Sequence, residues 1–277
     1  MPSLRDLKKH LRSIEMTGQL AGAMKTVSAA KYSRINNILQ NYADYAAVCE
    51  RISRHFGSAL TEAYPCVNPN APRGIVVLGS NRGLCGGYNI ELLNFADACL
   101  ADSASSCELI VAGKTAIAHF RDNAVPIKQE FLLPDVVQYS DCLPLLDYVL
   151  DLYRAGEIST IEIINQKFIN MLTQSPILTQ LLPWKAPDDQ TPEKEILYLP
   201  DRGTALRSAA ETCINAGVYM RILESSAGAQ AATLMAMRSA FDNAEKSSNE
   251  LQAAISRKRQ SDVTASVIET AGGYFET

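Results

Sequence analysis

The sequence predicts an α/β fold in which long N- and C-terminal helices form an antiparallel coiled coil and a Rossmann-like α/β domain lies between them. Three observations support this expectation. Residues 1–60 and 203–277 carry apolar side chains spaced three or four residues apart. Neither helical segment is interrupted by proline, because no proline lies between Pro2 and Pro65 or after Pro200. Residues 70–200 instead alternate short apolar runs with amphipathic segments, which is typical of an α/β domain.

The first long helix is expected over residues 3–57. Ser3 and Asp6 have the spacing of a capping box, which satisfies the free N–H groups of a helix start. The apolar residues that follow in steps near a heptad repeat are Leu4, Leu7, Leu11, Ile14, Leu20, Met24, Val27, Ile35, Ile38, Tyr42, Tyr45, Ile52 and Phe56.

The second long helix is expected to begin near residue 203, with Asp201 or Thr204 as its cap, and to stop at Gly272–Gly273. Its apolar seam steps through Leu234, Met237, Phe241, Ala244, Ser248, Leu251 and Ile255. At 1.5 Å per residue the two helices are roughly 80 Å and 100 Å long, too long to fold back into a compact domain of this size. They therefore bury their seams against each other, and the longer C-terminal helix ends in an unpaired tip.

Small residues recur along both predicted helices. Those expected to face one another are Thr17–Gly18, Ala21–Ala23 and Ser28–Ala30 on the first helix, and Ala227–Ala229, Ala231–Ala232 and Ala236 on the second. Each interior glycine costs up to about 1 kcal/mol of helix stability relative to alanine, but small side chains allow close backbone approach. Two interpretations remain: a thin rod that fits a narrow sleeve, or a helix pair of poor propensity.

The middle segment predicts a largely parallel sheet, because strands alternate with helices. Strands are expected over 73–79, 107–113, 125–132, 159–168 and 195–200, helices over 89–101, 114–122 and 142–155, and a loop over 183–192.

Composition excludes several functional classes. The net charge of −4 predicts no attraction to nucleic acid or anionic lipid. No apolar run approaches the roughly 18–20 residues of a membrane span, and no signal peptide is evident. The seven cysteines form no C-x-x-C pair and are expected to be reduced thiols. His10, His55 and His119 lie far apart, so neither a metal site nor a catalytic constellation is expected.

A glycine-rich stretch at 79–89, GSNRGLCGGYN, lies between a predicted strand and a predicted helix. Phosphates are often bound at this position of an α/β fold. The stretch nevertheless matches neither G-x-G-x-x-G nor the P-loop pattern. It is either a nucleotide-binding loop or a turn in which a strand, a loop and a helix meet closely.

Basic residues dominate the N-terminal helix, and a second basic cluster follows near the C-terminus. They are Arg5, Lys8, Lys9, Arg12, Lys25, Lys31 and Arg34, with Arg257, Lys258 and Arg259. These residues form either a solvated helix face or a cationic rod that enters an acidic sleeve.

Three stretches together carry a family resemblance. AMKTVSAAKYSR (23–34) is close to AMKMVAAAK, GSNRGLCGGYN (79–89) is close to DRGLCGGYN, and AMRSAFDNA (236–244) corresponds to AMxxATxNA. Arg259, Gln260 and Thr264 then match RQxxIT. In this order, the stretches resemble the γ subunit, or central rotor shaft, of rotary F-type ATP synthases. The resemblance extends from about residue 4 to 273.

The resemblance implies a non-catalytic subunit without cofactor or metal. Its partners are the α and β subunits of the F1 ring, the ε subunit and the membrane c-ring, and it lies on the cytoplasmic face of the bacterial membrane without inserting into it. Rotation of the shaft couples ion flow to ATP synthesis or hydrolysis at the β subunits. Partner contacts are carried over to Met24, Lys25, Arg259 and Gln260, and a structural role in the signature loop to Arg82, Gly83, Leu84, Gly86 and Gly87.

Several positions depart from the family pattern. Gly18 and Gly22 stand where Gln and Lys are usual, Ala229 and Thr233 where Glu and Arg are usual, and Ser266 where Glu is common. The chain is thus expected to be a divergent member. Two other hypotheses are a soluble coiled-coil protein whose α/β module binds a nucleotide at 79–89, and an α/β enzyme with helical arms.

Overall fold

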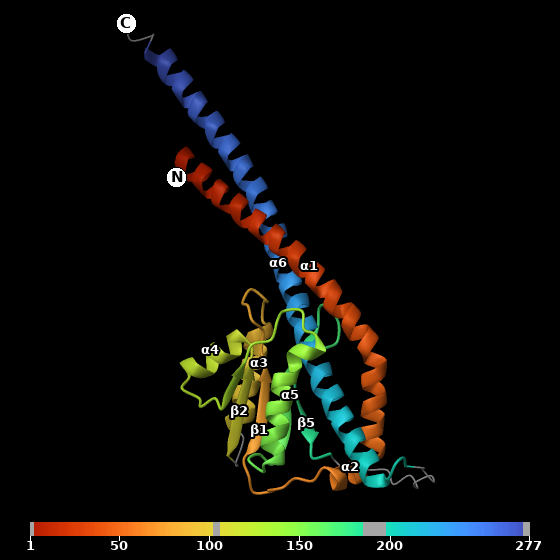
Figure 1. Cartoon of the computed structure of the whole chain (residues 1–277). Helices are drawn as coiled ribbons and strands as arrows, with labels where there is room; N and C mark the ends of the chain where they lie inside the picture. The colour runs from red at the N-terminus through yellow and green to blue at the C-terminus, as the bar shows by residue number, and fades with distance from the viewer. Residues whose placement is uncertain (1–2, 102–105, 185–197, 274–277) are drawn as a thin grey trace. The chain divides into compact units, whose positions relative to one another are not determined.

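The computed structural model describes the backbone of residues 3–101, 106–184 and 198–273, and the side chains of these residues up to 268. Figure 1 shows a central α/β region and two long helices. In chain order the elements are α1 (Leu4–His55), α2 (Gly57–Ala63), β1 (Arg73–Leu78), α3 (Tyr88–Ala101), β2 (Cys107–Ala112), α4 (Lys114–Asp122), β3 (Gln129–Phe131), α5 (Tyr139–Arg154), β4 (Thr160–Phe168), β5 (Gln174–Leu182) and α6 (Arg202–Gly273).

The five strands form one sheet in the order β3-β2-β1-β4-β5. β1 pairs in parallel with both β2 and β4, and β2 pairs in parallel with β3. β5 pairs antiparallel with β4 and forms one edge. The predicted Rossmann-like, largely parallel sheet is therefore confirmed.

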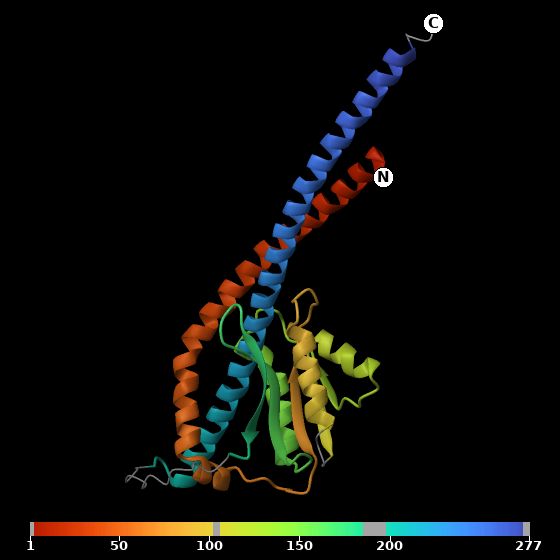
Figure 2. The same cartoon turned by 180° about the vertical axis from the view of Figure 1, so that it is seen from behind.

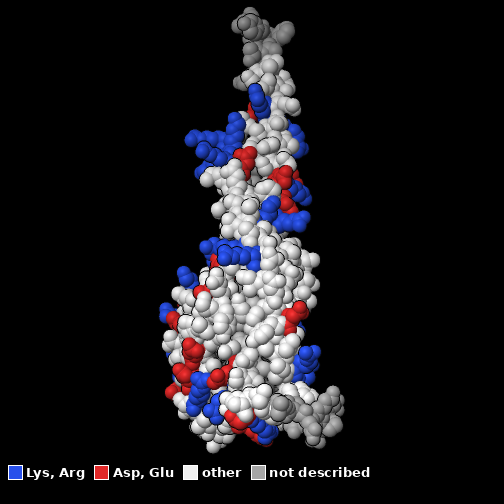
Figure 3. All heavy atoms as spheres, turned by 45° about the vertical axis from the view of Figure 1, so that its right-hand side comes forward, with Lys and Arg blue, Asp and Glu red and all other residues white. Residues whose placement is uncertain are grey.

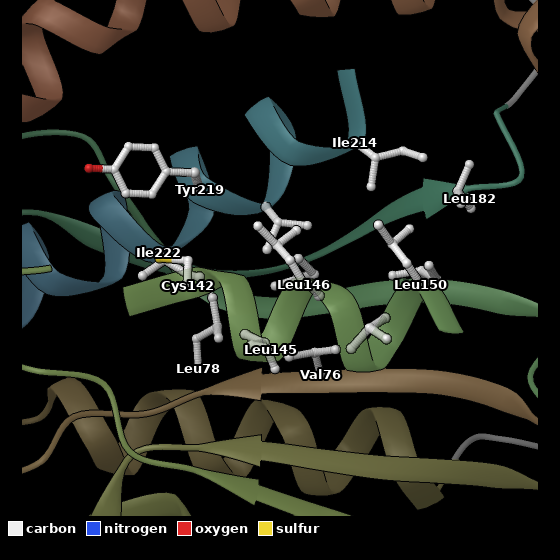
Figure 4. Close-up of a cluster of buried hydrophobic side chains, with 14 of the residues drawn as sticks. Val76, Leu78, Cys142, Leu145, Leu146, Leu150, Leu182, Ile214, Tyr219 and Ile222 are labelled. Atoms are coloured by element: carbon white, nitrogen blue, oxygen red, sulfur yellow. The ribbon is translucent and has the colours of Figure 1, made fainter. Parts of the chain in front are cut away.

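Alternating residues of β1 divide the core into two layers. Ile75 and Val77 face a cluster completed by α3 and α4, whereas Val76 and Leu78 face a larger cluster completed by α5 and α6. Figure 4 shows α5 between β1 and α6, with Leu145 near Val76. The segment of α6 that follows Arg202 is thus part of the core of the α/β region.

The strand predictions differ from the structure in three places. β5 was not expected, and β3 covers only part of 125–132. β5 contains Pro176, which argues against a central strand, but an edge strand tolerates a residue that lacks an N–H group. Of the strand expected over 195–200, residues 195–197 lie outside the described residues, and 198–200 are not in a strand. The loop expected over 183–192 lies mostly outside the described residues too.

Both predicted helix starts are confirmed. The Asp6 N–H donates to Ser3 Oγ (3.2 Å), and the Ser3 N–H donates to Asp6 Oδ2 (3.3 Å), which completes the capping box. At the start of α6, the Thr204 N–H donates to Asp201 Oδ1 (3.0 Å), so Asp201 is the cap.

The chain divides into two compact units, and each long helix contributes to both. The helical unit consists of the described residues of 1–27 and 234–277, and the α/β unit of those of 28–233. In the helical unit the helices pair antiparallel: a Cβ on Gly18 would lie 3.2 Å from Ala244 Cβ, and Gln252 Nε2 donates to Glu15 Oε1 (3.4 Å).

The seam of α6 in the helical unit is confirmed, whereas the seam of α1 is shifted at two positions. Leu20 and Val27 were expected in the seam but are 63% and 50% exposed. The seam instead runs through Gly18 and Ala21, which are buried. On α6 every described side chain from 259 to 268 is exposed, and Figure 1 shows α6 continuing beyond the start of α1. The unpaired tip is therefore confirmed.

The small residues of α6 near 227–232 do not all face α1 as expected. A Cβ on Gly228 would lie 3.0 Å from the ring of Tyr88 in α3. Ala229 packs in the same place against Cys85 and Tyr88. Small side chains are needed here because α6 lies against the glycine-rich loop of the α/β unit.

Candidate functional site

The glycine-rich loop between β1 and α3 is held by hydrogen bonds to its own backbone. The Arg82 carbonyl accepts from Ser80 Oγ (2.7 Å) and from Asn89 Nδ2 (3.3 Å). The Ser80 carbonyl accepts from Thr115 Oγ1 of α4 (2.6 Å). The loop is thus tied to α3 and α4 as well as to β1.

The five signature residues differ in their surroundings. Gly86 has a φ of 58°, a left-handed conformation that glycine adopts without steric cost. A Cβ on Gly87 would lie 2.9 Å from Glu91 Oε1. Arg82, Gly83 and Leu84 are exposed, and Leu84 holds a φ of 64° although it is not glycine.

A buried tyrosine joins the loop to α6. Tyr88 Oη donates to the Ser225 carbonyl (2.8 Å), and Ser225 Oγ donates to the Leu78 carbonyl at the end of β1 (3.1 Å). Burial raises the pKa of Tyr88 above its usual value, so the phenol stays protonated and continues to donate. This relay fixes α6 to the carboxyl end of the sheet.

Asp135, which follows β3, brings two of the family stretches together. Lys31 Nζ of α1 lies 2.5 Å from Asp135 Oδ2, and Arg82 Nε of the loop lies 3.8 Å from the same oxygen. Burial opposes the ionisation of Asp135, but the hydrogen bond and charge of Lys31 prevail and lower its pKa. One carboxylate therefore contacts both α1 and the loop.

The space beside the loop does not suit a nucleotide. It measures about 40 Å³ and is lined by the carboxyl ends of β1 and β2, by Asp135 and by α6. Small-molecule sites usually measure about 300–1,000 Å³, several times this volume. The structure therefore favours the interpretation of 79–89 as a turn between β1 and α3 over that of a nucleotide-binding loop.

Residues of the family stretches 23–34 and 236–244 contact each other inside the helical unit. Lys25 Nζ lies 4.2 Å from the centre of the Phe241 ring, within cation–π range. A Cβ on Gly22 would lie 3.2 Å from the same ring. Phe241 stands where the AMxxATxNA pattern has Thr, so glycine at position 22 makes room for the larger side chain.

The four residues expected to contact partners all lie in the helical unit, whereas the signature loop belongs to the α/β unit. Met24 and Lys25 are half-buried on α1, whereas Arg259 and Gln260 are exposed on the tip of α6. Arg259 makes no ion pair with any described residue, while its neighbour Lys258 pairs with Asp262 (2.8 Å).

The described residues contain neither a metal-binding cluster nor a helix suited to cross a membrane. No group of three or more His, Cys, Asp or Glu side chains in them is arranged to hold a metal ion. None of their helices combines the length and apolar character that crossing a membrane requires.

Taken together, these features define a class of protein: an α/β domain inserted between two long helices that pair antiparallel. The model of the ATP synthase family matches residues 3–275, and the chain belongs to this family. A relative from Stenotrophomonas maltophilia, "ATP synthase gamma chain", is 30% identical over 99% of both chains. One of the same name from Pelotomaculum thermopropionicum is 29% identical over 99% of this chain and 98% of its own.

Solved structures share the fold. A chain of the Euglena gracilis mitochondrial ATP synthase, in a structure titled OSCP/F1/c-ring, matches with a TM-score of 0.65 and 17% identity, covering 97% of this chain and 92% of that one. A chain in the Tetrahymena thermophila central stalk/c-ring structure matches with a TM-score of 0.62 and 19% identity, covering 80% and 99% respectively.

Proposed function

We propose that this chain is the non-catalytic central-stalk γ subunit of a rotary F1Fo ATP synthase, coupling ion-driven rotation to ATP synthesis or hydrolysis at the β subunits. The family match and the names of its relatives support this proposal. Within it, the chain has three segments: helix 1–60, α/β domain 70–200 and helix 203–277. Its partners are the α and β subunits, the ε subunit and the c-ring, on the cytoplasmic face of the bacterial membrane.

The observation that carries the proposal is apolar surface left uncovered on the helical unit. Met16, Leu20 and Val27 repeat at four- and seven-residue steps along one face of α1 and are 50–63% exposed. On the α6 tip Val263, Val267 and Ile268 are 56–66% exposed. Exposed apolar stripes of this kind mark surfaces that partners cover. A shaft enclosed by a ring of subunits has such surfaces on several sides.

Charge supports the same interpretation. Figure 3 shows Lys and Arg side chains gathered on the visible face of the helical unit. This unit contains the sequence clusters Arg5–Arg12 and Arg257–Arg259 in a chain whose net charge is −4. A basic helical unit speeds entry into an acidic sleeve and orients it there.

Replacing Leu20 with aspartate tests the role of the apolar stripe. Burying an aspartate in place of leucine costs about 2–3 kcal/mol or more, so we expect at least about a tenfold loss of assembled complex. The measurement is recovery of α and β subunits and of ATPase activity when the tagged chain is purified from solubilised membranes of its source.

The matched control is Gln19→Asp, because Gln19 is exposed and adjacent in sequence but outside the stripe. Wild type and this control should recover α and β in about threefold excess over the tagged chain, as a closed ring requires. If the wild-type chain is recovered without them, the proposed function is wrong. Equal recovery by both variants would refute the role of the stripe alone.

The exposed Arg259 gives a second test. We propose that Arg259 and Gln260 contact a β subunit at the tip of α6. Met24 and Lys25 contact a β subunit at another position along the shaft. Arg259→Ala should leave the isolated chain folded but reduce ion pumping per ATP hydrolysed by about fivefold, the equivalent of about 1 kcal/mol. Pumping and hydrolysis are measured together in membrane vesicles. Arg257→Ala is the control, because Arg257 Nε donates to the Ala253 carbonyl of its own helix (3.4 Å). Identical coupling in both variants would place the contact elsewhere.

A further inference from the structure

Two cysteines that are 164 positions apart in the sequence meet inside the α/β unit. Cys49 lies near the end of α1 and Cys213 near the start of α6, and both are free thiols, 4% and 6% exposed. Cys213 Sγ lies 3.4 Å from the Cys49 carbonyl oxygen. With Ala216 they form a small buried cluster of their own. The Cys213 thiol is thus held against the backbone of Cys49, in a cluster that contains both residues.

A groove leads to this pair. It measures about 430 Å³ and runs between α1, α6 and the strands β4 and β5, elements that Figure 2 shows from behind. Both cysteines line it, together with Glu50, Ser53 and Trp184. Both cysteines therefore border a space large enough for a small reagent.

We propose that Cys49 and Cys213 form a reversible disulfide that cross-links α1 to α6 when the protein meets a low-molecular-weight disulfide. Neither the family nor the proposed rotor role enters this inference, which rests on the placement of the two thiols. Disulfides of intracellular proteins are usually of this transient, redox-sensing kind.

The reaction is ordinary thiol–disulfide exchange. The thiolate of one cysteine attacks a sulfur of the small disulfide R–S–S–R, forms a mixed disulfide and releases R–S⁻. The thiolate of the other cysteine attacks the protein sulfur of that mixed disulfide and releases the second R–S⁻. Two protein thiols are oxidised, one small disulfide is reduced, and the two protons pass to the released thiolates. Burial raises the pKa of Cys213, so the reaction is slow and needs long incubation.

Two other cysteines in the described part of the chain also share a hydrophobic cluster. Cys99 and Cys107 both pack at the margin of the cluster under α3 and α4. Cys85, in contrast, is buried beside Asn89, whose Nδ2 lies 3.1 Å from its sulfur. Cys85→Ser is therefore a matched control that removes a buried thiol and leaves both pairs intact.

The test is peptide mapping of the folded full-length chain after incubation with 2-hydroxyethyl disulfide and alkylation of the remaining thiols. We expect one linked peptide pair containing Cys49 and Cys213, two hydrogens lighter than the sum of its parts and separated by dithiothreitol. Cys49→Ser and Cys213→Ser should lose it, and Cys85→Ser should keep it. The cross-linked protein should melt about 5–10 °C higher than the reduced protein, because a long loop is closed.

The proposal is overturned if Cys49 and Cys213 are recovered in separate peptides, either alkylated or each carrying half of the reagent. A Cys99–Cys107 link formed in place of theirs also overturns it. The wild-type map decides the question even where a serine variant fails to fold. A cross-link without a change in melting temperature would overturn the stabilising effect of the link.

Discussion

Gly113→Ala is expected to destabilise the α/β unit by at least about 3 kcal/mol, which urea unfolding followed by circular dichroism measures. Gly113 precedes α4 with a φ of 101°, a conformation that L side chains rarely adopt. A Cβ there would overlap the carbonyl oxygen of Gly79. Neither backbone can move away, because the Gly79 N–H donates to the Ala112 carbonyl (2.8 Å) and the Gly113 N–H to the Phe131 carbonyl (3.0 Å).

Gly83→Ala is the matched control. Gly83 lies in the exposed part of the signature loop, and a Cβ there would meet nothing within 4 Å. The control should stay within about 0.5 kcal/mol of the wild type. If Gly113→Ala were equally mild, the close approach between the ends of β1 and β2 would not constrain the fold.

Arg73→Met should cost about 3 kcal/mol of unfolding free energy, because it leaves a buried carboxylate without its guanidinium partner. Arg73 at the start of β1 binds Glu162 of β4 through two hydrogen bonds, one of them from Nε to Oε1 (3.1 Å). The Glu162 side chain is only 7% exposed. Its carboxylate raises the pKa of Arg73 through these bonds. Thermal or urea unfolding gives the loss directly.

The Arg121–Glu130 pair provides the control for this substitution. It has the same two-bond geometry, with Nε to Oε1 at 2.8 Å and Nη2 to Oε2 at 2.6 Å, but Arg121 is 65% exposed. Arg121→Met should therefore cost no more than about 1 kcal/mol. Replacing both members of the buried pair, as Arg73→Met with Glu162→Leu, should recover most of the loss. Equal losses from both single substitutions would show that burial is not the cause.

Periodicity predicted the fold well wherever neighbours in sequence determine structure. The capping box at Ser3, the helix over 114–122 and the seam of α6 depend on local spacing, and all three are found. Leu20 was misplaced because α1 carries apolar residues on two faces, and periodicity alone does not tell which face meets α6. Tertiary packing decides this, through the small side chains of Gly18 and Ala21.

The candidate site was predictable only in part. The signature loop was located from its glycines, but the groups that fix it, Asp135 and Ser225, carry no recognisable pattern because their partners are distant in sequence. Phe241 could have been found from its mismatch with the family pattern, together with the glycine at 22. Whether Arg259 and Gln260 contact a partner remains a prediction, since an exposed side chain in a single chain reveals its surroundings only when the partner is present.

The seam between α1 and α6 in the helical unit joins residues that are separated in the chain by the whole α/β unit. Gly18 and Ala244 meet only after the whole α/β domain has been made. Contacts between distant parts of a chain form late, because loop closure must be completed first. During synthesis, Leu7, Leu11 and Ile14 of α1 are therefore without their partner helix until α6 has been made. Apolar surface left exposed in this way makes a partly folded chain prone to aggregate.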